Sequence, residues 1–140
     1  MQTFLPYQNF YKCAKCLDNK RLGKQRVEVK QIYLALTKGS RWENHPIVKM
    51  WKGYEEALLF YGIVICKEWK NRGFKDNLLQ EFEEEFTKYS NGVFPNWLGN
   101  EEFHKSHRLN LLFKNPEHYV QYFDEDVPTT KPEYVWIKEG

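Results

Sequence analysis

The chain has 140 residues, of which 41% are hydrophobic and 29% charged, as is typical of one soluble globular domain. The net charge of +2 gives no general affinity for polyanions, and no apolar run is long enough to cross a membrane. The start, MQTFLPYQNF, lacks the apolar core of a secretion signal. We therefore expect a single monomeric domain over residues 1–140, in a cytosol-like compartment that keeps its three cysteines reduced.

The charges are unevenly distributed along the chain. Residues 12–41 hold nine Lys or Arg and two acids, whereas residues 76–102 hold seven acids and one Lys. One basic flank on a nearly neutral molecule suits a phosphate-bearing partner. Two solvated helix faces of opposite sign would give the same pattern, so both interpretations remain open.

Helical signals dominate the first half of the chain. A short helix is expected over residues 8–16, and a second runs from Asp18 or Asn19 to about Leu36, before Gly39. Pro46 opens the third helix, whose apolar residues recur at helical spacing from Ile47 to Trp69. The spacing predicts one continuous helix over residues 46–72, with glycines that allow another helix to pack closely.

Three shorter helices are expected over residues 77–89, 100–114 and 116–123. The tail, residues 127–140, is interrupted by proline and extended, and its Tyr134 and Trp136 favour packing against the body. The sequence thus predicts an all-α fold, a compact single-domain bundle around one long central helix with an irregular aromatic C-terminal arm.

Cys13 and Cys16 have the spacing of half a zinc site, but no second pair follows. Cys66, His104 and His107 could complete a site. Two small apolar residues on a short helix are the simpler interpretation, and we expect no metal and no cofactor.

Several polar residues have both a functional and a structural explanation. His104, His107 and Arg108 share one helical face, either to contact phosphates and bases or as a solvated face. His45 either caps the third helix or points into a cleft beside the second. Arg26 lies on an apolar stripe and needs a carboxylate partner, for which Glu55 or Glu56 is expected.

The stretch RLGKQRVE, residues 21–28, keeps one acid among three cations. On a helix Glu28 lies on the same side as Arg21 and Gln25, at the boundary of core and surface. An ion pair with Arg21 or Lys24 would explain it structurally. A carboxylate in a phosphate-binding cleft weakens affinity, however, which favours a catalytic acid or base, or a stabiliser of the oxocarbenium-like sugar formed when an N-glycosidic bond breaks.

LDNKRLGKQRVEVKQI resembles the catalytic helix of the phage endonuclease V type of pyrimidine-dimer DNA glycosylase. Leu17, Leu22 and Glu28 fall on that family's two leucines and its catalytic glutamate, and Arg21 falls on its DNA-contacting histidine. The segment from His45 through KNRGF and the stretch FKNPEHYVQYF also resemble the family in order. The full pattern is similar to an uncharacterised branch of this superfamily.

The resemblance implies a metal-free, all-α enzyme that acts on double-stranded DNA containing a damaged or modified pyrimidine. In that family a nucleotide opposite the lesion is flipped and the duplex is kinked. The N-terminal amine attacks the sugar C1′ and forms an imine, and β-elimination then nicks the strand. Glu28 would support the sugar cation and the proton transfers.

Gln2 departs from the family, which exposes a small residue there, so the reacting amine would be that of Met1. Lys20 or Lys24 could replace this amine, or Glu28 could activate water in a glycosylase without lyase activity. Trp51 or Trp97 would stack on bases. A non-catalytic nucleic-acid-binding module and a helical protein-interaction domain remain alternatives. The residues expected to contact DNA are Lys20, Arg21, Lys24, Gln25, Arg26, His45, His104, His107 and Arg108.

Overall fold

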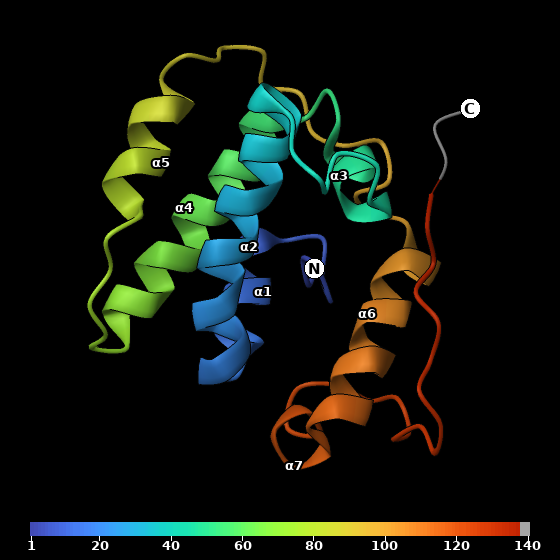
Figure 1. Cartoon of the computed structure of the whole chain (residues 1–140). Coiled ribbons are helices and arrows are strands. Elements are labelled where there is room, and N and C mark those ends of the chain that lie inside the picture. The colour runs from blue at the N-terminus through green and yellow to red at the C-terminus, as the bar shows by residue number, and fades with distance from the viewer. Residues whose placement is uncertain (138–140) are drawn as a thin grey trace.

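The computed structural model describes residues 1–137, which contain only helices as regular secondary structure (Figure 1). The predicted all-α fold is therefore confirmed. None of the helices in this range is long and apolar enough to cross a membrane. In chain order the helices are α1 (Phe10–Cys16), α2 (Asn19–Lys38), α3 (Pro46–Trp51), α4 (Glu55–Asn71), α5 (Leu79–Phe86), α6 (Glu101–Lys114) and α7 (Pro116–Tyr119).

Helix α4 is the centre of the bundle and packs against α1, α2 and α5. Its inward residues, among them Leu58 and Ile65, are fully buried. At Gly62 an added Cβ would lie 2.8 Å from Val29 of α2 and 3.0 Å from Phe82 of α5. Glycine at this position lets the two neighbouring helices approach α4 on both sides, as the sequence predicted.

The predicted continuous helix over residues 46–72 is wrong, because it is divided into α3 and α4. Gly53 adopts a φ of +87°, a left-handed conformation that ends the first helix. The side chain of Glu55 then accepts a hydrogen bond from the Gly53 N–H over 3.3 Å and so supports the start of α4. The apolar spacing continues across the break, so the periodicity alone did not reveal it.

Two extended segments complete the molecule and matter for the site. The N-terminal segment, residues 1–8, lies between α2 and α6 (Figure 1). The C-terminal arm, residues 124–137, runs alongside α6, where the Val135 N–H donates to Ser106 Oγ over 3.1 Å and Tyr134 packs edge-on against His107. The last three residues of the predicted arm, 138–140, lie outside the described residues.

Candidate functional site

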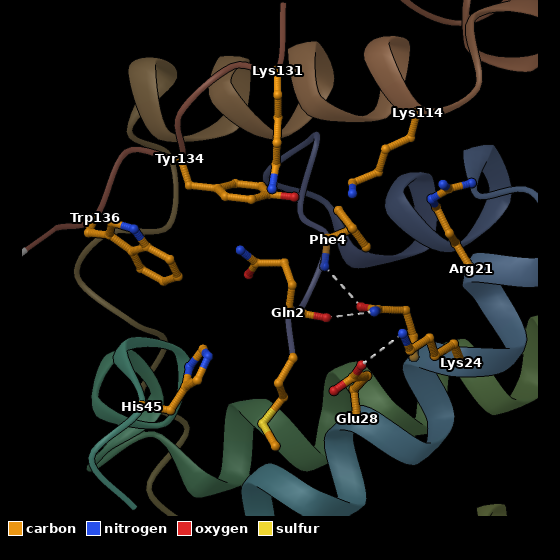
Figure 2. Close-up of a pocket in the computed structure, with 12 residues that line it drawn as sticks. Gln2, Phe4, Arg21, Lys24, Glu28, His45, Lys114, Lys131, Tyr134 and Trp136 are labelled. Carbon is orange, nitrogen blue, oxygen red and sulfur yellow. Dashed lines mark hydrogen bonds and ion pairs between the residues drawn. The ribbon is translucent and has the colours of Figure 1, made fainter. Parts of the chain in front are cut away.

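A cavity of about 340 Å³ opens between α2, the N-terminal segment, the start of α3, the end of α6 and the C-terminal arm (Figure 2). Half of its lining residues were singled out from the sequence: Met1, Arg21, Lys24, Gln25, Glu28 and His45. The other half were not expected to take part in a site: Gln2, Phe4, Lys114, Lys131, Tyr134 and Trp136.

Glu28 projects into this cavity from α2, and only 5% of the residue is exposed to solvent. Its Oε1 lies 3.9 Å from Nζ of Lys24, a loose ion pair, and its Oε2 has no hydrogen-bond partner within residues 1–137. Burial raises the pKa of the carboxyl group, against the opposing effects of the terminal amine of Met1, of Lys24 and of the Gln2 backbone N–H. The structure therefore holds a carboxylate that protein contacts leave partly unsatisfied.

Four cationic side chains surround the same cavity. Arg21 and Lys24 come from α2, whereas Lys114 and Lys131 reach in from the opposite wall (Figure 2). Arg21 lies 3.3 Å from Asp18, but within residues 1–137 neither Lys114 nor Lys131 pairs with a carboxylate. Burial, followed by the charges of Lys131, Arg21 and Lys24, lowers the pKa of Lys114. Such an excess of positive charge suits a phosphate-bearing ligand.

Gln25 fixes the N-terminal segment to α2 beside Glu28. Its Nε2 donates to the Gln2 carbonyl over 2.8 Å, and its Oε1 accepts from the Phe4 N–H over 2.9 Å and from the Tyr61 hydroxyl over 2.7 Å. The side-chain amide is buried and has partners on both ends. Gln25 was predicted to contact DNA, but here it positions the first residues of the chain in the cavity.

The histidines of α6 hold the N-terminal segment from the other side. Nδ1 of His107 accepts from the Leu5 N–H over 2.9 Å. Nε2 of His104 accepts from the Gly99 N–H over 2.9 Å, so its Nδ1 donates to the Leu5 carbonyl over 2.7 Å. Both rings are buried, which lowers both pKa values, that of His107 to about 3. The expected solvated face is therefore wrong, and neither histidine lines the cavity.

Arg108 also holds the N-terminal segment on the α6 side. Its guanidinium donates to the Pro6 carbonyl over 2.9 Å, to Glu125 over 2.7 Å and to Glu101. Its side chain is only 12% exposed, so burial and ion pairing occupy the group that was expected to bind DNA. The structure places Arg108 in the support of the N-terminal segment.

Arg26 and Lys20 also lie away from the cavity. Nε of Arg26 is 2.6 Å from Oδ1 of Asp76, and its guanidinium lies over the Trp69 ring at 5.3 Å. The expected pairing with Glu55 or Glu56 is wrong, because the segment before α5 brings Asp76 closer. Lys20 is exposed on α2 and does not line the cavity.

Trp51 and Trp97 cannot act as the predicted stacking residues, because they are 0% and 1% exposed. They pack edge-to-face at 5.0 Å, and their indole N–H groups donate to Thr3 and Met50. The aromatic rings of Phe4, Tyr134 and Trp136 do line the cavity, and Trp136 is 40% exposed. The extended arm carried no sequence signal that would have placed these rings beside Glu28.

His45 fulfils both of its sequence interpretations. It is the N-cap of α3, where Nδ1 accepts from the Ile47 N–H over 3.1 Å, and it lines the cavity. Figure 2 shows its ring pointing toward the space between Trp136 and Gln2. Burial, followed by the charge of the terminal amine, lowers the pKa of this histidine.

The cysteines take no part in this cavity. Cys13, Cys16 and Cys66 are buried free thiols, in agreement with the simpler interpretation of the Cys13–Cys16 spacing. Burial raises the pKa of Cys16 and that of Cys66, each to about 12, which keeps both in the unreactive thiol form. Residues 1–137 contain no group of three His, Cys, Asp or Glu placed to hold a metal ion.

Comparison with known proteins gave one family match. A family model described as pyrimidine dimer DNA glycosylase matches residues 1–82. No curated protein and no solved structure matches the chain. The matched range includes Met1, α2 with Glu28, and His45, whereas Lys114, Lys131, Tyr134 and Trp136 lie beyond it.

Proposed function

This chain belongs to the pyrimidine dimer DNA glycosylase family, and from that premise we propose that it excises a damaged or modified pyrimidine from duplex DNA and then nicks the strand. Glu28 is the catalytic carboxylate, and the α-amine of Met1 is the nucleophile. The reaction takes place in the cavity between α2, α6 and the C-terminal arm.

One observation carries the proposal: Glu28 is buried beside the first residues of the chain and is only loosely paired. A buried carboxylate that serves stability alone is normally hydrogen-bonded on both oxygens, since desolvation without a partner is costly. Glu28 instead lines a cavity with room for a ligand, and its buried Oε2 has no hydrogen-bond partner within residues 1–137. Perturbed carboxylates in such cavities are candidates for general acid–base catalysis.

The proposed chemistry needs one amine and one carboxylate. The neutral amine attacks C1′, the bond from C1′ to the base nitrogen breaks, and its electron pair leaves with the base. The new ammonium gives a proton to Glu28, which passes it to O4′ as the sugar ring opens to a protonated imine. The Glu28 carboxylate then removes a C2′ proton, and the 3′ phosphate leaves by β-elimination.

The cations and aromatic rings supply the binding part of the proposal. Arg21 and Lys24 on one wall, and Lys114 and Lys131 on the other, hold phosphates on both sides of the reacting sugar. Trp136 offers a ring on which an unstacked base can lie. Contacts to phosphates carry no sequence information, so the protein selects a lesion or modification and not a sequence.

Borohydride trapping tests the proposal directly. Purified protein is mixed with duplexes that carry a thymine dimer, an abasic site or no lesion, and reduction converts the imine to a stable adduct. We expect adducts on both damaged duplexes, a cross-link that maps to Met1, and no adduct with Glu28→Gln.

Other outcomes would change specific parts of the proposal. A cross-link at Lys24 would replace the nucleophile but keep the imine. Base release without any adduct would leave a glycosylase in which Glu28 activates water. Salt-dependent DNA binding without adduct or base release, unchanged in Glu28→Gln, would refute catalysis and favour a non-catalytic nucleic-acid-binding module.

A further inference from the structure

His45 is held rigidly where the cavity meets α3. Its backbone N–H donates to the Trp42 carbonyl over 2.8 Å, and its ring packs edge-on against the Trp42 ring, with centroids 6.2 Å apart. Nδ1 accepts from the Ile47 N–H over 3.1 Å. These contacts fix the position of the imidazole and determine which nitrogen can carry the proton.

A neutral imidazole has one donor and one acceptor nitrogen. Because Nδ1 of His45 is the acceptor of the cap hydrogen bond, the proton of the neutral ring must be on Nε2. Within residues 1–137 no hydrogen bond to Nε2 is present, and His45 lines the same cavity as Glu28. The lowered pKa of His45 favours this neutral form at neutral pH. The cap thus leaves an N–H donor available to a ligand.

We propose that Nε2–H of His45 donates a hydrogen bond to the departing base, at the carbonyl oxygen next to the glycosidic nitrogen, and so acts as a catalytic residue in base release. This inference rests on the proposed glycosylase activity. As the C1′–N bond breaks, its electron pair moves onto the base, and negative charge develops on that oxygen. A fixed donor stabilises this charge. No proton leaves His45, and the released anion takes its proton from water.

The proposed role of His45 affects only one of the two steps of the reaction. Base release needs a leaving-group donor, whereas imine formation at a preformed abasic site does not, because no base is present. Glu28 and Met1 serve both steps. A defect confined to the first step is therefore specific to His45 and would not follow from a general disturbance of the cavity.

His45→Asn is the variant that tests this role. Asparagine is a good N-cap residue, so its side-chain oxygen can accept from Ile47. Its amide N–H groups lie closer to the backbone than Nε2 of the imidazole, so the donor at the Nε2 position is lost. Base release, measured as cleavage of the C1′–N bond, is followed under single-turnover conditions on duplexes carrying a thymine dimer, an oxidised pyrimidine or a 5-modified cytosine. In the dimer the cleaved thymine stays joined to its neighbour, so cleavage is detected there as the new abasic sugar. Trapping is measured in parallel on a preformed abasic site. We expect base release to fall about 100-fold and abasic-site trapping to stay within about twofold.

His45→Ala is the matched control, since it removes both the cap and the donor. Its melting temperature should lie below that of His45→Asn, while the two variants lose base release equally. An activity that follows the melting temperature would overturn the proposal and leave His45 as a helix cap.

The other possible results of these experiments distinguish the role of His45 from the proposed function. Equal losses of base release and abasic-site trapping, or no loss of either, would overturn the role of His45 and leave the proposed glycosylase intact. A wild-type protein that releases no base from any of these duplexes would overturn the proposed function, and the inference with it.

Discussion

The N-terminal segment lies between two polar clusters that differ in how well their groups are satisfied. On the α6 side, His104 and His107 are buried, and Nδ1 of each ring bonds to the Leu5 backbone. The half-buried Arg108 donates to the Pro6 carbonyl and to neighbouring acids. On the α2 side, Glu28 keeps one oxygen without a partner, and the lysines across the cavity have no carboxylate within residues 1–137. We call the first the complete cluster, because its groups have partners within the chain, and the second the unsatisfied cluster.

The comparison reverses the impression given by the sequence. HKSHR, residues 104–108, has the composition of a phosphate-binding site, yet it anchors backbone. From the sequence, Glu28 could be one half of an ordinary surface ion pair, yet in the structure it is buried and one of its oxygens has no partner. Residue type alone therefore did not reveal which of these groups have partners within the chain, whereas the hydrogen bonds of the folded structure do.

The largest predicted effect is that of a substitution in the unsatisfied cluster. Glu28→Gln should slow base release about 1000-fold, because the amide accepts no proton at neutral pH. Its free energy of unfolding should not fall, since no buried charge remains to be desolvated. Single-turnover kinetics and urea unfolding test both parts, with Glu43→Gln, an exposed acid outside the cavity, as control. A stable Glu28→Gln protein with full activity would contradict the assignment.

A substitution in the complete cluster should instead lower the stability of the protein. Arg108→Ala leaves Glu125 and the Pro6 carbonyl without their partner, which should lower the free energy of unfolding by about 3 kcal/mol. Urea unfolding measures this effect. A protein of normal stability that no longer binds DNA would instead place Arg108 at the DNA interface.

Acid should weaken the complete cluster first. The pKa of buried His107 is lowered to about 3, so the unfolded chain, with an ordinary value of 6.5, takes up the proton more readily. The stabilising contribution is complete above pH 6.5 and is lost as the pH falls toward 3, by up to about 1.4 kcal/mol per pH unit. Urea unfolding from pH 7 to pH 4 should show this slope, and His107→Phe should reduce it by about one proton.

Glu28 should give the opposite pH dependence. Its pKa is raised above 4.5, so the folded state holds the proton more strongly than the unfolded chain. The contribution of Glu28 to the free energy of unfolding is most favourable below pH 4.5. It becomes less favourable as the pH rises through the raised pKa of the folded state. Glu28→Gln should remove this loss of stability. Unfolding profiles of the variant and the wild type that stay parallel from pH 4 to pH 8 would argue against a perturbed carboxyl group.

The smallest effect concerns the wall formed by Lys114 and Lys131. Replacing either with glutamine should weaken binding of an abasic-site duplex several-fold and reduce its salt dependence by about one ion. Lys105→Gln is the control, because Lys105 is exposed on α6 and does not line the cavity. Equal slopes for all three variants would remove this wall from the DNA interface.

Much of the fold could be predicted from local patterns. Periodicity and caps placed α1, α2, α5 and α6 within a few residues, because those signals are contained in single helices. The break at Gly53 was missed, since apolar spacing continues across it. The stacking role predicted for Trp51 or Trp97 was wrong, because segments distant in the sequence bury both rings.

The sequence by itself determined the helical class, the choice of Glu28 and the cations that share α2 with it, since helical spacing fixes which side chains lie on one face. Only the tertiary structure decided which polar groups remain unsatisfied. Contacts between residues about a hundred positions apart, such as Leu5 with His107, occupy one set of candidates, and the C-terminal arm brings Lys131 and Trp136 to the cavity that Glu28 lines. Burial and pairing depend on those long-range contacts, which no local pattern encodes.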